Sequence, residues 1–220
     1  MMTLQRKTRV LLADDHAIIR DGLKQILADT PDLMVAGEAA NGHDVLQLVR
    51  EGAWDVLVLD LSMPGRSGLD LIRVLKDECP TLPILVLSMH HEEQYAVRAL
   101  HAGALGYLTK ENDGEVLVNA IRRVAAGGVY VTPNVAALMI RGVHANGEQA
   151  LHTALSDREY QIFCLIVSGK GLTEIAEQLC VSVKTVSTHK AHILQKMGMN
   201  NAAALVRYAV SHRLVEPLDL

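Results

Sequence analysis

Short apolar runs alternate with stretches of helical periodicity along the first half of the chain. The runs are as long as strands and rich in Val, Ile and Leu, and lie at 9–13, 33–39, 54–60, 82–88 and 104–109. The stretches that follow them have apolar residues at helical spacing, at 16–28, 44–51, 69–77, 92–101 and 115–126. This alternation predicts a doubly wound α/β domain with a five-stranded parallel sheet covered on both faces. Positions 56–59 and 84–87 are apolar throughout, as expected of central strands.

The pattern changes after residue 126. A weakly helical segment follows, which we interpret as a linker because it is interrupted by Gly127, Gly128, Pro133, Gly142 and the polar stretch 145–149. From residue 155 onward all the spacing is helical. Expected helix signals are a capping box of Ser156 with Glu159, N-caps at Thr173 and Ser182, a stop at Gly198 and a last helix at 201–212. We therefore predict a domain at 7–126, a linker at 127–150 and a small all-α four-helix domain at 151–220.

Composition and charge fit this division. With 220 residues, 50% hydrophobic and 21% charged, the chain suits two globular domains. The net charge of −4 is uneven, because residues 1–149 carry 14 Lys and Arg against 19 Asp and Glu, whereas residues 150–220 carry 7 against 6. This asymmetry predicts different partners for the two halves. We expect a cytoplasmic protein without a signal peptide or membrane span, with buried thiols at Cys79, Cys164 and Cys180.

Three carboxylates follow predicted strands. Asp14 and Asp15 come directly after the first strand, and Asp60 ends the third. Ligands of open parallel sheets bind at the carboxyl ends of the strands, where the first and third strands would be neighbours. Clustered carboxylates repel one another unless a cation lies among them, and Mg²⁺ suits a few oxygen ligands together with a phosphate. The alternative is that two of these acids simply cap helices.

Two further polar residues end strands at the same predicted edge. Lys110 follows the fifth strand and Ser88 ends the fourth. Either one alone would be an ordinary surface residue, but together they add a cation and a hydroxyl to the acids. Phosphoryl transfer depends mainly on such positioning and charge stabilisation. His16 adjoins the acids, and we interpret it as a solvent-facing residue at the start of a helix rather than a metal ligand.

These residues resemble a known family. The sequences 12–16 (LADDH), 60–68 (DLSMPGRSG) and 107–110 (YLTK), together with Ser88, are similar to receiver domains of two-component response regulators over about residues 8–126. The resemblance implies that Asp60 accepts phosphate from a sensor histidine kinase. It also implies an Mg²⁺ site of Asp14, Asp15, Asp60 and the backbone carbonyl of Ser62, a switch pair of Ser88 and Tyr107, and Lys110 as the family's lysine. Glu111 departs from the proline common at its position, which leaves the isomer of the Lys110–Glu111 peptide open.

The second domain contains a helix, a short turn and a second helix, at 172–179, 180–183 and 184–197. This geometry lays a second helix in the major groove of DNA. One stripe of that helix should face the domain core, formed by Val183, Val186, Ile193, Leu194 and Met197. Lysines and short hydroxyl side chains lie outside the stripe and suit phosphate and base contacts. The alternative is a solvated helix face without a partner.

The sequences 155–159 (LSDRE), 175–179 (IAEQL) and 183–190 (VKTVSTHK) resemble the LuxR-type helix-turn-helix domain over residues 154–212. Together with the receiver, the whole chain is similar to the NarL/FixJ family of transcriptional response regulators. The resemblance implies a homodimer that binds inverted-repeat DNA, with the final helix at the dimer contact. It also implies DNA contacts by Lys184, Thr185, Ser187, Thr188 and Lys190.

Three other functions compete with this interpretation. A phosphatase using Asp60 as nucleophile would need a second acid two residues later, where Ser62 stands. A DNA-binding protein that works without phosphorylation would have no use for the complete pocket. An adaptor that only binds proteins would not need the recognition helix. We therefore expect a transcriptional regulator rather than an enzyme.

Overall fold

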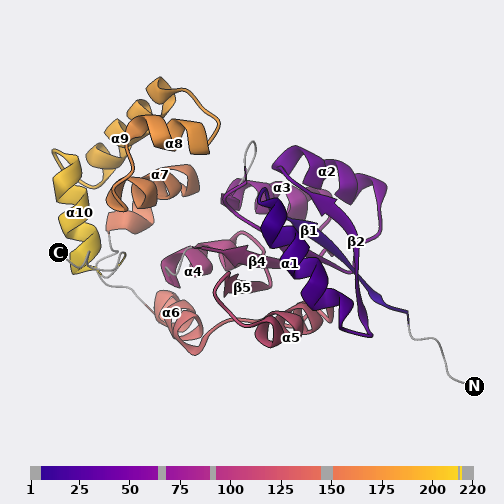
Figure 1. Ribbon diagram of the computed structural model, residues 1–220. Helices are drawn as coiled ribbons and strands as arrows, with labels where there is room; N and C mark the ends of the chain where they lie inside the picture. Colours follow the sequence, from indigo (N-terminus) through magenta and orange to yellow (C-terminus); the bar gives the residue numbers. More distant parts are fainter. Residues whose placement is uncertain (1–5, 64–67, 90–92, 145–150, 213, 215–220) are drawn as a thin grey trace, which may run out of the picture. The chain divides into compact units, whose positions relative to one another are not determined.

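The computed structural model describes residues 6–63, 68–89, 93–144, 151–212 and 214 (Figure 1). Its internal contacts form two compact units, one drawn mainly from residues up to 136 and the other mainly from residue 137 onward. The division at residues 136 and 137 lies within the predicted linker 127–150, whose residues 145–150 lie outside the described residues. None of the described helices combines the length and apolar composition that a membrane span requires.

The first unit is built on the predicted five-stranded parallel sheet. Its strands are β1 (Thr8–Ala13), β2 (Leu33–Ala39), β3 (Val56–Leu59), β4 (Ile84–Ser88) and β5 (Gly106–Thr109). They lie in the order β2-β1-β3-β4-β5, and every neighbouring pair is parallel. β1 and β3 are therefore adjacent, as expected, and the chain reverses direction across the sheet between them. Such a reversal is where open α/β sheets bind ligands.

Five helices accompany the sheet: α1 (Ala17–Ala28), α2 (Gly42–Glu51), α3 (Gly68–Glu78), α4 (Glu93–His101) and α5 (Gly114–Ala125). Parallel crossovers are right-handed, so α2, α3 and α4, whose connections advance in one direction, share a face of the sheet. The connection through α1 runs the other way, and α1 packs with α5 on the opposite face (Figure 1). The sheet is thus covered on both sides, which explains why every residue of β3 and β4 is buried.

The predicted strand 54–60 is shorter in the structure. The Asp55 carboxylate accepts a hydrogen bond from the Arg9 backbone N–H at 2.7 Å, and the indole N–H of Trp54 donates to the Leu48 carbonyl at 2.8 Å. The side chains of Trp54 and Asp55 thus make hydrogen bonds just before the strand, which begins at Val56. Asp60 comes directly after the strand and starts the loop that carries the site.

A helix occupies part of the predicted linker. α6 (Pro133–His144) contains Gly142, which the sequence pattern suggested as an interruption. Proline at the first position of a helix loses no internal hydrogen bond, and one glycine costs a helix only about 1 kcal/mol. These residues therefore tolerate a helix that their side-chain types alone do not predict.

The second unit is helical, as predicted. It consists of a 3₁₀ turn η1 (Leu151–Ala154) and the helices α7 (Asp157–Val167), α8 (Leu172–Gln178), α9 (Val183–Lys196) and α10 (Ala202–Ser211). Side chains that are fully buried form its core, among them Tyr160, Phe163, Ile175, Val186, Ile193 and Leu205. This core combines one residue or more from each of the four α-helices.

Most of the predicted helix signals are confirmed. Ser156 and Glu159 form the capping box of α7, and Ser182 caps α9. Gly198 follows α9 with a left-handed φ of 63°. Thr173 is not a cap, because α8 begins one residue earlier and Glu174 instead accepts a hydrogen bond from the Gly171 N–H at 2.6 Å.

Two predictions of burial are wrong. Val183 is 44% exposed, since it is the first residue of α9 and lies beyond the reach of the core that holds Val186 and Ile193. Cys180 is exposed in the turn between α8 and α9, where its φ of 51° places it in the left-handed region. Of the other cysteines, Cys164 is buried and Cys79 is intermediate.

Candidate functional site

The register of the sheet brings two predicted acids together. Ala13 of β1 pairs with Leu59 of β3, so the next residue of each strand, Asp14 and Asp60, lies at the same edge. The Asp60 N–H donates to the Ala13 carbonyl at 2.8 Å, which extends this pairing by one residue. Asp14 is 2% exposed and Asp60 only 1%. Two carboxylates are thus almost fully removed from water at one strand edge, a costly arrangement unless cations compensate them.

Lys110 supplies one such cation. β4 and β5 pair Ser88 with Thr109, and the Lys110 N–H continues the pairing by donating to the Ser88 carbonyl at 2.9 Å. Its ammonium Nζ lies 2.6 Å from Asp14 Oδ2 as an ion pair and donates to Asp60 Oδ2 at 2.9 Å. The Lys110–Glu111 peptide bond, whose isomer the sequence leaves open, is trans.

Burial and charge act against each other in this pocket. Burial raises the pKa of Asp60, and the Lys110 ammonium opposes this rise without cancelling it. Burial alone would lower the pKa of Lys110, but attraction to Asp60 and Asp14 outweighs it and raises that pKa. Lys110 therefore stays charged, but its charge does not fully compensate the cost of burying an ionised Asp60 carboxylate.

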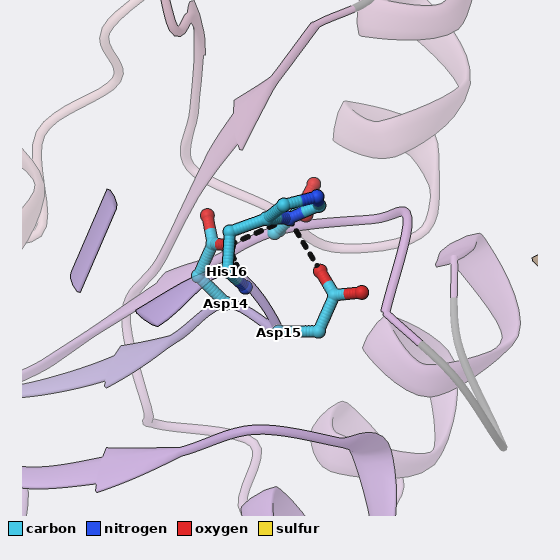
Figure 2. A group of neighbouring side chains, drawn as sticks. Asp14, Asp15 and His16 are labelled. Atoms are coloured by element: carbon cyan, nitrogen blue, oxygen red, sulfur yellow. Dashed lines mark hydrogen bonds and ion pairs between the residues drawn. The ribbon is translucent and has the colours of Figure 1, made fainter. Parts of the chain in front are cut away.

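Asp15 and His16 are exposed and lie next to Asp14 (Figure 2). The imidazole Nδ1 of His16 is 2.9 Å from Asp15 Oδ1 and 3.3 Å from Asp14 Oδ1. The His16 side chain is 62% exposed, in line with its interpretation as solvent-facing, yet it also contacts both acids. One ligand atom from each of Asp14, Asp15, His16 and Asp60 lies within 4.8 Å of the others. One cation can contact atoms at such spacings, so the residues fit a metal ion.

Ser62 lies at the rim of the same pocket. Its backbone N–H donates to Asp60 Oδ1 at 3.1 Å and helps to hold that carboxylate. Residues 64–67 of the predicted motif lie outside the described residues. Oxygen ligands from carboxylates and a backbone carbonyl are the set that Mg²⁺ prefers.

Ser88 and Tyr107 lie on neighbouring strands. Tyr107 pairs with Val86 in the sheet register, two residues before the Ser88–Thr109 pair. Ser88 is completely buried, and Tyr107 is 6% exposed. The hydroxyl residue next to Lys110 and the aromatic residue are therefore both inside the domain.

α8 and α9 form the helix-turn-helix of the second unit. Lys184, Thr185, Ser187 and Thr188 are exposed, and Lys190 is half-buried. They lie away from the buried positions Val186, Ile193 and Met197, whereas Leu194 is only partly buried. The hydroxyl of Thr185 bonds to the Ser182 hydroxyl at 2.8 Å, and Thr188 Oγ1 donates to the Lys184 carbonyl at 3.0 Å. Two of these hydroxyls thus also support the helix itself.

Arg158 and His189 were not among the functional residues that the sequence predicts for this unit. The guanidinium of Arg158 on α7 donates to the Leu179 carbonyl at 3.3 Å, which ties α7 to the turn before α9. His189 on α9 is half-buried, and burial together with the charge of Arg158 lowers its pKa. The spacing of His189 from Val186 and Ile193 is a sequence signal of its inward position, but nothing local to Arg158 indicates its contact 21 residues away.

A parallel five-stranded sheet with this acid pocket, in one chain with a helix-turn-helix, defines a response regulator with a DNA-binding output domain. The comparisons agree with this class. The family model described as response regulator receiver domain matches residues 10–122, and that described as bacterial regulatory proteins, luxR family, matches residues 153–209. The chain belongs to the NarL/FixJ family of two-component response regulators.

Relatives share nearly the whole length of the chain. The oxygen regulatory protein NreC of Staphylococcus carnosus is 39% identical over 215 residues, covering 94% of this chain and 99% of the relative. NreC of Staphylococcus aureus is 40% identical with the same coverage. Among solved structures, RcsB of Salmonella enterica bound to promoter DNA with the phosphomimetic BeF₃⁻ is 28% identical with a TM-score of 0.66, covering 94% of this chain and all of that one. The regulator ChrA of a heme-sensing system is 33% identical with a TM-score of 0.52, covering 95% and 99%.

Proposed function

We propose that Asp60 accepts a phosphoryl group from a histidine of a sensor kinase and that this modification controls DNA binding by a dimer of the chain. The observation that carries the proposal is the placement of Asp60, 1% exposed at the end of β3 with its Oδ2 bonded to Lys110. We retain 7–126 as the receiver, 127–150 as the linker and 151–220 as the DNA-binding domain. A regulator of bacterial chromosomal DNA acts in the cytoplasm.

The chemistry follows from the pocket. An Asp60 oxygen attacks the phosphorus of the phosphohistidine, an O–P bond forms as the N–P bond breaks, and the histidine nitrogen leaves. Lys110 lies where it stabilises the charge of the transferred group. Asp14, Asp15, Asp60 and the Ser62 carbonyl would hold Mg²⁺, whose charge offsets that of the phosphoryl oxygens. Lys110 and the Ser62 N–H hold the Asp60 carboxylate in place through hydrogen bonds to its two oxygens.

Ser88 and Tyr107 form the proposed switch. The phosphoryl group adds roughly −1.5 to −2 charges and new acceptor oxygens beside the Ser88 hydroxyl. A hydrogen bond to them would draw Ser88 toward Asp60 and change the space around Tyr107. Tyr107 is only 6% exposed, so its ring is already buried. The switch therefore concerns how this ring packs inside the domain and not a large movement from solvent.

A groove beside Lys110 suits the kinase. It has a volume of about 230 Å³ and is lined mainly by apolar side chains of α1 and of the strand ends, among them Ile19, Leu23, Leu87 and Met89. Ile18 of α1 is 87% exposed. Lys110 lines this groove and also contacts Asp60, so a partner seated here would lie one side chain away from the acceptor.

The second unit supports binding as a dimer. Lys184, Thr185, Ser187, Thr188 and Lys190 offer phosphate and base contacts along α9, as a recognition helix requires. On α10, Ala203, Val206 and Val210 recur at helical spacing on the side away from the buried Leu205 and Ala209. We propose this apolar stripe as the contact between two copies, which would place two recognition helices on an inverted-repeat site.

Mass spectrometry of the chain treated with a small phosphodonor and Mg²⁺ tests the acceptor. We expect one added phosphate on Asp60, none in Asp60→Asn and little in Asp15→Ala, which loses a metal ligand. Asp70→Asn, on the exposed first turn of α3, is the matched control and should label normally. Undiminished labelling of Asp60→Asn would refute the assignment.

A further inference from the structure

The outer edge of β5 has a partner that comes from the predicted linker. β5 is the last strand of the sheet, and an open edge leaves backbone groups ready to pair. The Tyr130 N–H donates to the Leu105 carbonyl at 2.9 Å, and the Tyr107 N–H donates to the Tyr130 carbonyl at 3.1 Å. Gly106 and Tyr130 thereby form a parallel bridge. Tyr130 extends the sheet by one residue.

Two glycines direct the chain to this edge. At the end of α5, the Gly127 N–H donates to the Val124 carbonyl at 2.8 Å and the Gly128 N–H to the Arg123 carbonyl at 2.9 Å. Gly127 has a left-handed φ of 78°, and a Cβ on Gly128 would lie 3.0 Å from the Arg123 carbonyl oxygen. This αL ending of the helix turns the chain back along the sheet.

The bridge also needs a glycine on the strand. A Cβ on Gly106 would lie 3.1 Å from the Tyr130 carbonyl oxygen and 2.7 Å from a methyl carbon of Leu85. The close approach of Tyr130 to β5 therefore depends on the absence of a side chain at 106. The contact is built into both segments rather than being a chance approach of a loop.

The bridge is directly connected to the start of α6. Thr132 lies two residues after Tyr130. Its Oγ1 accepts a hydrogen bond from the Val135 N–H at 3.3 Å, and its carbonyl accepts one from the Ala136 N–H at 3.0 Å. Thr132 thus caps α6, which begins at Pro133. With so short a connection, a displacement of Tyr130 must move or loosen the first turn of the helix.

On its other side the bridge includes the backbone of the proposed switch residue. Tyr107 donates its N–H to the bridge, and three residues later Lys110 contacts Asp60. We propose that the Tyr107–Tyr130 backbone bridge transmits the state of the phosphoryl pocket to α6 and onward to the DNA-binding domain. This inference rests on the proposed function. A shift of the Tyr107 backbone must either carry Tyr130 with it or break their hydrogen bond, and both outcomes act on α6.

Two substitutions at one position separate the backbone bridge from the side chain. Tyr130→Pro removes the ring and the N–H that donates to the Leu105 carbonyl, so it breaks one of the two hydrogen bonds of the bridge and leaves the Tyr130 carbonyl that accepts from Tyr107. Tyr130→Ala removes the same ring but keeps the N–H and is the matched control. Both full-length variants are titrated onto a DNA duplex that the wild-type chain selects from a random pool, with and without BeF₃⁻ and Mg²⁺. Hydrogen exchange of the Tyr107 and Tyr130 amides is followed in the wild type under the same conditions.

We expect BeF₃⁻ to raise the DNA affinity of the wild type and of Tyr130→Ala by about tenfold, and that of Tyr130→Pro by less than about twofold. The exchange rate of the Tyr107 amide, which donates to the Tyr130 carbonyl, should change by at least about tenfold on BeF₃⁻ binding. A full gain in Tyr130→Pro, equal losses in both variants, or an unchanged exchange rate would overturn the proposal. A wild type that binds BeF₃⁻ without any gain would contradict the proposed function, while the exchange rate of the Tyr107 amide would still decide whether the pocket and the bridge are coupled.

Discussion

Lys110 contacts two buried carboxylates, and its removal would leave Asp14 and Asp60 facing each other without this cation. Breaking such a buried pair costs about 3–5 kcal/mol. We predict that Lys110→Met lowers the free energy of unfolding by this amount in EDTA and that Mg²⁺ restores part of it, because the metal then supplies the missing charge. Thermal unfolding in EDTA and in Mg²⁺ measures both effects.

The control is Lys24→Met, which removes two exposed ion pairs, with Asp21 and Glu38, and should destabilise the protein far less than Lys110→Met in either condition. Equal destabilisation of Lys110→Met with and without Mg²⁺ would show that the metal does not bind among these acids.

At this scale the sequence predicts which residues meet better than how they meet. Asp14 and Asp60 come together because both follow strands that are neighbours in a parallel sheet, which the order of elements implies. The simultaneous contact of Lys110 with both acids depends on the reach of its side chain from the end of β5 past β4 to Asp60 and Asp14, which no local pattern records. His16 shows the same limit, since helical position predicts its exposure and not its contact with Asp15.

Among the elements, α7 and α9 are joined by one carboxylate. Glu159 accepts hydrogen bonds from the Ser156 N–H at 2.8 Å and from Lys196 at 2.6 Å. Burial would raise the pKa of Glu159, but these bonds lower it below its ordinary 4.5. The resulting stabilisation is therefore complete above about pH 4.5 and is lost as the pH falls through the lower pKa of the folded state.

We predict that Glu159→Gln destabilises the second unit by about 1–3 kcal/mol at pH 7 and by progressively less below pH 4.5. Hydrogen exchange of the α7 amides in both proteins across this pH range gives the difference. A difference that stays constant as the pH falls would show that the charge of Glu159 contributes nothing.

α9 carries a prediction about how DNA is read. Lys184 is exposed at the start of the helix, and a flexible ammonium binds phosphates without selecting bases. Lys184→Ala should weaken binding to all duplexes alike and reduce the salt dependence by about one unit of slope. Thr188→Ala should cost about 1–3 kcal/mol on the preferred duplex and little on random DNA. Salt titrations on both duplexes would contradict this orientation of α9 if the two variants exchanged these effects.

Element boundaries were predictable where capping chemistry is local. Ser156, Ser182 and Gly198 act within one turn of their own helix, and all three have their expected roles. The extent of α6 was not predictable because its segment has only weak helical spacing and contains Pro133 and Gly142, although its cap at Thr132 acts within the first turn of the helix. Val183 similarly has the spacing of a core residue but lies at a helix end without core around it.

At the scale of the whole molecule, the two units have separate functions. In our proposal, phosphorylation of Asp60 in the first unit controls DNA binding by the second. The first unit carries an acid pocket in a sheet, and the second carries a recognition helix on its own core. The charge difference between the halves of the sequence agrees with this division, since the acidic half carries the carboxylates that would hold a cation and the half without excess negative charge carries the DNA-binding domain. The combination of a receiver with a LuxR-type domain in one chain therefore indicates that the pocket influences the affinity for DNA.

The most direct test measures the affinity of the full chain for a duplex that it selects from random DNA, before and after treatment with a phosphodonor and Mg²⁺. The wild type should bind more tightly after treatment, whereas Asp60→Asn should show no gain. Ser88→Ala should take up phosphate but lose most of the gain. An equal gain in the wild type and Asp60→Asn would contradict the claim that a phosphoryl group on Asp60 controls DNA binding.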